Sequence, residues 1–314
     1  MVIYYKANIG CKGHSLRLTE TIRKGNFSMK IGVMVESYRL GFRAGVEKAA
    51  ALGAAGIQAY ATGGELGIAT MTPAKAKEAL DIVKSNGLVF SAICGDFGYG
   101  FDDPARNPEM IEKSKRVIDV AKMLECDIVT THIHRVPEVE CEQKEILRAA
   151  CTELGKYADS MGSKFALETG PEFGAVLGGF LQSLDTTGVR VNFDPANLVM
   201  VAGDRPENAL KYLGKYVVHT HAKDGIMLKK GVEEALKIGK EAKEHQAMIE
   251  MGRSYLELPL GDGDVDFDIY LPALAATGFN GFLTIEREVG DSPEKDIAMA
   301  VQFLKEKIEK FNLK

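Results

Sequence analysis

From residue 30 onward the chain alternates short apolar runs with longer segments of helical periodicity. Each run is rich in β-branched and aromatic residues and leads into a loop with Gly, Pro or Asp, the pattern of a strand followed by a helix. The runs predict eight strands, at Ile31–Val35, Gly56–Ala61, Leu88–Cys94, Asp127–Ile133, Lys164–Leu167, Val189–Phe193, Tyr216–Thr220 and Phe282–Ile285. The longer segments predict helices that include Pro108–Leu124, Cys141–Met161 and Ser292–Phe311. Eight strands that alternate with helices favour one closed parallel (β/α)₈ barrel of the TIM type.

Two segments fall outside this alternation. Residues 1–29 are polar and irregular, so we interpret them as an N-terminal extension or tag that precedes a barrel domain over residues 30–314. After the seventh strand the sequence predicts a charged helix at Val232–Met248 and then a loop at Met251–Asp264. Long loops at this end of a barrel usually cover the active site.

Composition narrows the class of protein. The 314 residues are 46% apolar, enough for one large core, and no run of eighteen apolar residues predicts a membrane span. The formal net charge of −5 disfavours nucleic acid as a partner and suits a small polar substrate. Five cysteines at irregular spacing predict reduced thiols, and no secretory signal is recognisable, so we expect a cytoplasmic protein.

Potential metal ligands stand at the ends of the last four predicted strands. They are Glu168, Asp194, His221 and Glu286. The carboxyl ends of barrel strands converge on one mouth, where these groups would repel one another or stay unsatisfied unless a cation neutralised them. Three carboxylates and one imidazole suit one divalent ion per chain, with Mn²⁺ the first expectation and Mg²⁺, Co²⁺ or Zn²⁺ as alternatives.

The segments that carry these four residues are L-E-T, F-D-P-A-N, H-x-H-A-K-D and T-I-E-R-E. Together they resemble the xylose-isomerase-like barrel superfamily of sugar phosphate isomerases and epimerases, over roughly Lys30 to Lys310. The resemblance implies that the four residues bind the metal and that the protein forms a homodimer or homotetramer. It favours His221 over His219 as the ligand, because His221 stands in the H-x-K-D pattern. We expect His219 to point the other way or to support its neighbour from behind.

Further residues are candidates for contacts with a carbohydrate substrate. His132 and His134 follow the fourth strand, and a period of two places both on one side, with His132 lining the pocket and His134 at its rim. Ketose 3-epimerases of the superfamily have a histidine at the position of Asn197, so the chain departs from that subfamily, although an amide can still bind a substrate oxygen.

Three more candidates lie near the expected mouth. Glu36 follows the first strand, and Lys223 follows His221 by two residues. Arg253 resembles the position from which related epimerases offer an arginine to substrate hydroxyls, and its guanidinium would equally suit a phosphate.

The resulting hypothesis is a metal-dependent isomerase or epimerase of a sugar, sugar phosphate or related polyol ketone. One of Glu168 and Glu286 would remove a carbon-bound proton to give an enediolate, and the other carboxylate would return a proton to a different face or carbon. The alternatives are an inosose-dehydratase-like lyase, an apurinic-endonuclease-like enzyme and a non-catalytic sugar-binding protein. The endonuclease is disfavoured because only part of its three-metal ligand set is visible and the chain is acidic.

Overall fold

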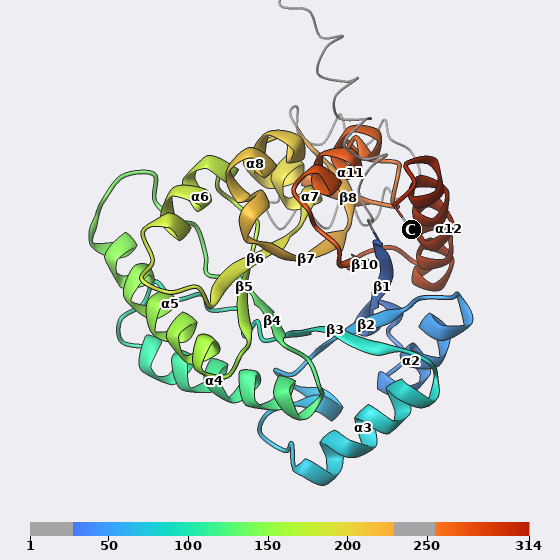
Figure 1. The fold of residues 1–314 in the computed structure, drawn as a ribbon, viewed down its shortest axis with the longest axis horizontal. Coiled ribbons are helices and arrows are strands. Elements are labelled where there is room, and N and C mark those ends of the chain that lie inside the picture. Colours follow the sequence, from blue (N-terminus) through green and yellow to red (C-terminus); the bar gives the residue numbers. More distant parts are fainter. Residues whose placement is uncertain (1–27, 229–254, 314) are drawn as a thin grey trace, which may run out of the picture.

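The computed structural model describes residues 28–228 and 255–313. Eight parallel strands close into a barrel in the order β1-β10-β7-β6-β5-β4-β3-β2, and Figure 1 shows them as a central ring with the helices around it. The strands are β1 Lys30–Met34, β2 Gly56–Tyr60, β3 Val89–Cys94, β4 Ile128–Thr131, β5 Lys164–Glu168, β6 Val189–Phe193, β7 Val217–Ala222 and β10 Phe282–Ile285. The predicted single (β/α)₈ barrel is confirmed.

Each barrel strand coincides with a predicted apolar run, because parallel strands are buried on both faces and therefore need continuous apolar sequence. Val33 pairs with Ile57 of β2 on one side and with Ile285 of β10 on the other, and Val33 and Ile57 are completely buried. The β1–β10 pairing is what closes the ring. The largest difference from prediction is at β4, which ends two residues before Ile133, and at β7, which extends two residues past Thr220.

Longer helices lie between successive barrel strands, and a last one follows β10. They are α2 Phe42–Ala51, α3 Pro73–Ser85, α4 Asn107–Met123, α5 Glu142–Ser160, α6 Gly174–Gln182, α8 Pro206–Leu213, α11 Phe267–Ala276 and α12 Pro293–Lys310. Short turns at the strand ends complete the fold: η1 Val35–Tyr38, η2 Gly64–Leu66, α7 Pro195–Asn197, η3 Leu198–Ala202 and η4 Gly214–Tyr216. The predicted bounds of α4, α5 and α12 agree with the structure within one residue. In α4 and α12 a proline stands in the first turn, where the helix tolerates it.

An antiparallel hairpin follows β7 where the sequence predicted a loop. Its strands are β8 Asp224–Met227 and β9 Tyr255–Leu258, paired from Asp224↔Leu258 to Met227↔Tyr255. The prediction of a loop over Met251–Asp264 is therefore wrong at residues 255–258. Both strands are short, and each is stabilised by a partner distant in sequence, which local periodicity cannot reveal. The predicted helix Val232–Met248 lies outside the described residues.

The first described residues pack against the last ones. Met29 is buried, and its N–H donates to the carbonyl oxygen of Leu313 at 2.8 Å. Residues 1–27 of the predicted extension lie outside the described residues, so its boundary stays a prediction. In the two described ranges, no helix has the length and apolar character needed to cross a membrane. Cys94, Cys126 and Cys151 are free and buried, and Cys141 is free and exposed.

Candidate metal centre

The structure brings the four predicted strand-end residues to one point. Glu168 ends β5, Asp194 follows β6, His221 lies in β7 and Glu286 follows β10. All four are buried, and one potential ligand atom from each lies within 4.8 Å of the others. Nδ1 of His221 is at the centre, 3.3 Å from a Glu168 oxygen, 3.5 Å from Asp194 and 3.1 Å from Glu286.

Two buried atoms in this cluster have no hydrogen-bond partner: Oδ2 of Asp194 and Nδ1 of His221. The other Asp194 oxygen accepts the N–H groups of Ala196 and Asn197 and so caps α7. Leaving two such atoms unpaired away from water is costly, unless a cation binds both. The cluster could therefore bind a metal ion.

The charge balance of the cluster points the same way. Although burial disfavours a charged imidazole, Glu286 and Glu168 hold the pKa of His221 well above its usual value. The protein alone thus draws a proton to the place where the carboxylates converge. A divalent cation would supply that positive charge and leave the imidazole neutral, the form that binds metals.

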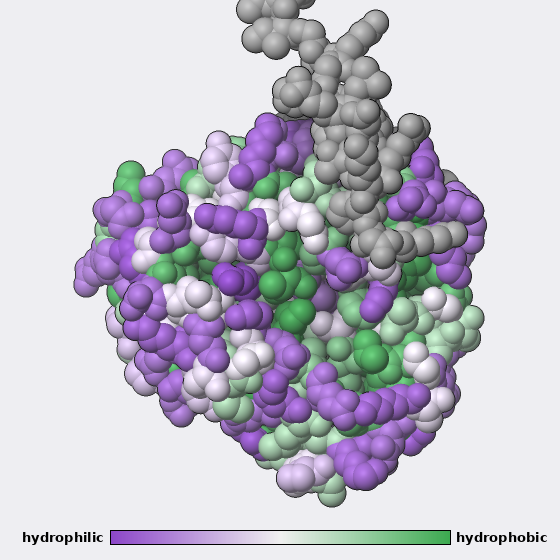
Figure 2. Space-filling model, viewed as in Figure 1, coloured by the Kyte–Doolittle hydropathy of each residue, from purple (hydrophilic) through white to green (hydrophobic). Residues whose placement is uncertain are grey.

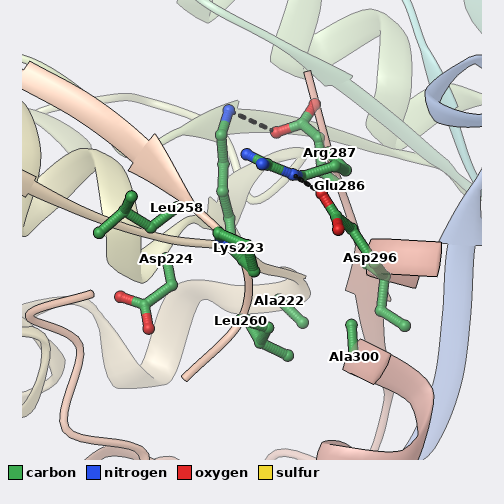
Figure 3. A pocket seen from close by; sticks show the side chains of 11 residues that line it. Ala222, Lys223, Asp224, Leu258, Leu260, Glu286, Arg287, Asp296 and Ala300 are labelled. Carbon is green, nitrogen blue, oxygen red and sulfur yellow. Dashed lines mark hydrogen bonds and ion pairs between the residues drawn. The ribbon is translucent and has the colours of Figure 1, made fainter. Parts of the chain in front are cut away.

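Glu286 is held by a buried lysine. Nζ of Lys223 lies 2.9 Å from a Glu286 oxygen and also contacts Glu288, and Figure 3 shows the lysine side chain extended toward Glu286. Burial opposes ionisation of Glu286, but His221 and Lys223 together hold its pKa well below the usual value. Lys223 was predicted as a substrate contact at the mouth, and the structure places it 4% exposed between two carboxylates.

Glu168 is held by two side-chain amides. Asn192 of β6 donates to one carboxylate oxygen at 3.0 Å, and Asn197 donates to the other at 3.1 Å. Asn197 also donates to the backbone oxygen of Thr169. The amide predicted to contact substrate is therefore turned toward Glu168, where it fixes the carboxylate.

A glutamine from the other side of the barrel sets the orientation of His221. Oε1 of Gln58 in β2 lies 3.1 Å from Nε2 of His221, and the Gln58 amide donates to Thr130 at 3.0 Å. Once the imidazole is neutral, the Gln58 oxygen favours the tautomer with the proton on Nε2, and the Asn192 amide nitrogen, 3.2 Å from the same atom, donates to Glu168 instead. The lone pair of Nδ1 then faces the carboxylates, as binding a metal requires.

His219 lies one layer deeper on the same side of β7. Its Nδ1 donates to Oδ1 of Asn192 at 2.8 Å, and the hydroxyl of Thr284 lies 2.9 Å from its Nε2. The alternative that His219 points away from His221 is wrong, because residues two apart on a strand share a face. Burial lowers the pKa of His219 well below its usual value, so the ring is neutral and supports Asn192.

His132 and Asp96 form a pair beside the cluster. Nδ1 of His132 lies 2.7 Å from Asp96, and Nε2 lies 3.5 Å from Glu168. β4 ends at Thr131 and His134 has a φ of 66°, so the expected period of two does not continue. His132, whose side chain is 42% exposed, lines the mouth, whereas His134 contacts Asp102.

Of the two remaining candidates, Glu36 lies within the described residues and Arg253 does not. Glu36 accepts the backbone N–H of Tyr60 at 3.0 Å and lines a pocket beside the cluster. Arg253 lies outside the described residues. The sequence reading missed Gln58, Asn192 and Asp96. A polar residue within an apolar strand run is a signal that could have identified the first two.

A model of the family described as xylose isomerase-like TIM barrel matches residues 46–307. An uncharacterized protein of Methanocaldococcus jannaschii is 25% identical over 217 residues, which are 65% of this chain and 64% of that protein. The chain thus spans less than two thirds of the length of this curated relative. The resemblance inferred from the strand-end segments is confirmed by the family match.

Solved structures extend the likeness over most of the barrel. A xylose isomerase domain protein from Planctomyces limnophilus is 25% identical with a TM-score of 0.74, covering 92% of this chain and 99% of that one. A D-psicose 3-epimerase with D-tagatose from Clostridium cellulolyticum H10 is 15% identical with a TM-score of 0.66, covering 89% and 99%. At 15% identity the second comparison shows a shared fold alone.

Proposed function

Because the chain belongs to the family of xylose isomerase-like TIM barrels, we propose that it is a divalent-metal-dependent isomerase or epimerase acting on a sugar, sugar phosphate or related polyol ketone. The observation that carries this proposal is the pair of buried carboxylates, Glu168 and Glu286, which lie 3.3 and 3.1 Å from the unpaired His221 nitrogen. Two carboxylates that face one small site can remove and return a proton on carbon.

Glu168, Asp194, Glu286 and Nδ1 of His221 would hold the ion, with Mn²⁺ the expected metal. When bound, a divalent ion polarises a carbonyl and acidifies the neighbouring C–H group. The protein supplies the fixed positions around it: Gln58 holds His221, and Asn192 and Asn197 hold Glu168.

The carboxylates move the proton. One of Glu168 and Glu286 takes a proton from carbon to leave an enediolate, and the other, which must enter this step as the carboxylic acid, delivers its own proton to carbon. Delivery to the opposite face of the same carbon inverts the configuration, and delivery to the adjacent carbon isomerises the sugar. A positioned carboxylate contributes roughly 10²–10⁴ in rate, and that contribution requires both groups to be held in register.

Substitution tests this assignment. In Glu168→Gln, only one of Asn192 and Asn197 still meets a side-chain oxygen, because the two amides donate to different oxygens of Glu168. The site also keeps one carboxylate where the reaction needs two, so deuterium incorporation from D₂O into a ketose at carbon should fall at least about 10²-fold. Glu47→Gln makes the same change on the exposed face of α2 and should incorporate deuterium like the unaltered protein. Substantial exchange by Glu168→Gln would remove this residue from the mechanism.

A dehydratase is the second candidate, and the pair of His132 and Asp96 favours it. An imidazole that Asp96 orients and that lies 3.5 Å from Glu168 is placed to give a proton to a departing hydroxyl. The same carboxylate would start the reaction, but the product would be one water lighter. Mass analysis of the product therefore separates the two candidates.

We further propose that the protein works in the cytoplasm as a homodimer or homotetramer, with a small carbohydrate as its partner. The resemblance to the sugar isomerase superfamily supports the assembly. Light scattering on the purified chain tests it, since a monomer at micromolar concentration would contradict it.

A further inference from the structure

A pocket of about 360 Å³ lies between the segments that follow β1 and β2. It is of the size that small-molecule sites have. The surface over this part of the fold is paler and greener than the hydrophilic margin of the same face in Figure 2. No residue of the candidate metal centre lines the pocket, so its chemistry is separate from that of the four converging groups.

The pocket adjoins the metal centre. Val33 of β1 pairs with Ile285, the residue before Glu286. Arg39, on the pocket wall, donates to the backbone oxygens of Glu288 and Gly290 at 2.9 Å each and so joins the wall to the segment after β10.

Tyr60 connects the two sites electrostatically. Its pKa is raised first by the adjacent Cys94 sulfur and by burial, and then by the charge of Glu286. The geometry of β2 agrees, because Gln58, which lies two residues before Tyr60 on the same face of the strand, contacts His221 of the metal centre at 3.1 Å, and Tyr60 lines the pocket. A ligand whose reacting carbons lie at the metal centre would therefore extend past Tyr60 into the pocket.

The lining combines hydroxyl-binding groups with an apolar floor. Glu36 and Glu65 each use one carboxylate oxygen for a backbone N–H, of Tyr60 at 3.0 Å and of Phe42 at 3.1 Å. Both carboxylates are thereby held on the wall, where the Tyr60 and Thr62 side chains also stand. Carboxylates accept hydrogen bonds from the hydroxyls of a sugar, and apolar side chains cover its C–H faces.

The same wall disfavours an anion. Two carboxylates face the pocket, and among the residues that the structure describes Arg39 alone brings a guanidinium to its wall, with both terminal nitrogens already donating to backbone carbonyls. We propose that this pocket binds an uncharged, polyhydroxylated end of the substrate, so that the protein selects neutral ketoses over their terminal phosphate esters. The inference rests on the proposed function and names its substrate class.

Calorimetric titration of the Mn²⁺-saturated protein with D-glucitol and with D-glucitol 6-phosphate tests the inference without turnover. Repulsion from two carboxylates should make the neutral polyol bind at least about tenfold more tightly. In the double variant Glu36→Gln and Glu65→Gln, each side chain keeps one oxygen for the backbone N–H that it accepts but loses its charge, and the preference should shrink to about threefold or less. Glu47→Gln removes a charge outside the pocket and should keep the full preference.

A blocking variant tests the location. Gly63 lines the pocket in extended backbone that any residue adopts, and a Cβ there would meet no atom within 4 Å. Gly63→Phe should weaken D-glucitol binding at least about tenfold by filling this space, while Mn²⁺ affinity stays unchanged. Equal or tighter binding of the phosphate ester, a preference that the double variant leaves intact, or binding of neither polyol overturns the inference.

These outcomes are separate from the fate of the proposed function. Deuterium exchange into ketoses reports on Glu168 and Glu286, whichever substrate end binds in the pocket. Exchange with phosphate esters in preference to neutral ketoses would refute this inference and leave the proposed function standing. Absence of exchange with every ketose would refute the proposed function while the polyol titration still reports on the pocket.

Discussion

At the scale of single residues, the candidate centre is defined by what its atoms lack. Nδ1 of His221 and Oδ2 of Asp194 are buried without partners, although every other nitrogen or oxygen of these two side chains is engaged by Gln58, Asn192 or the start of α7. The hydrogen bonds of these two side chains thus fix their orientation, and the two atoms without partners face the centre of the cluster. That arrangement is typical of a metal site supported from behind.

The deeper histidine should matter for metal affinity. In His219→Leu the side-chain oxygen of Asn192 loses the N–H donor that fixes the rotation of the amide, and Glu168 loses a fixed donor in turn. We expect Mn²⁺ to bind about 10–100-fold more weakly, measured by calorimetry. Thr284→Val removes only the hydroxyl at the far nitrogen of His219 and should weaken Mn²⁺ binding much less. Unchanged affinity in His219→Leu would show that the ring only fills space.

The sequence predicted the four converging residues because each directly ends a recognisable strand. Gln58 and Asn192 were missed because their roles depend on contacts between different strands. Gln58 of β2 contacts His221 of β7, although these two strands do not pair. Asn192 of β6 acts through its buried amide, which donates to Glu168 of β5. The expected alternation of faces does not reach His134 for a local reason: β4 ends at Thr131, and His134 has a left-handed backbone conformation.

At the scale of elements, the barrel strands were predictable and the hairpin was not. A parallel barrel strand is continuously apolar and recognisable by itself. β8 and β9 are four residues each, and β9 carries the buried Glu257, which accepts from Arg287. Such a strand is stabilised by an ion pair and a distant partner rather than by its own pattern.

A buried carboxyl joins the loops after β4 and β5 and should make stability depend on pH. Glu172 is 3% exposed and accepts the N–H of Val136 at 3.2 Å, and burial raises its pKa to about 7. The folded state therefore holds a proton that the unfolded chain releases near pH 4.5, so stability declines as pH rises from about 4.5 to 7.

Glu172→Gln removes this dependence. Relative to the unaltered protein, the variant should gain up to roughly 3 kcal/mol at pH 8 and little at pH 4.5, as measured by urea unfolding at both values. A difference between the two proteins that stays constant from pH 4.5 to 8 would mean that Glu172 titrates as in the unfolded chain.

At the scale of the whole molecule, the barrel converts eight local units into one site. The four candidate ligands are spread over the 119 residues from Glu168 to Glu286. Only closure of the ring brings one ligand atom of each within 4.8 Å of the others. The sequence could predict this convergence from the alternation of strands and helices. It could not predict the pocket beside the site, because loops rather than strand ends shape it.

A metal that bridges β5, β6, β7 and the end of β10 should stabilise the whole barrel. At a Mn²⁺ concentration 100 times its Kd, linkage adds about 2.7 kcal/mol, which corresponds to a rise in Tm of about 5 °C. Asp194→Asn keeps an oxygen to cap α7 but loses a ligand, and its Tm should not respond to Mn²⁺. A similar rise in both proteins, measured by scanning calorimetry, would place the bound ion elsewhere.

The most direct test of the metal centre is elemental analysis of the purified protein after reconstitution with Mn²⁺ and removal of free ion. About one ion per chain is expected, and His221→Ala, checked for folding by circular dichroism, should retain none. If the unaltered protein retains no metal after separate reconstitution with Mn²⁺, Mg²⁺, Co²⁺ and Zn²⁺, the four converging side chains do not form a metal site.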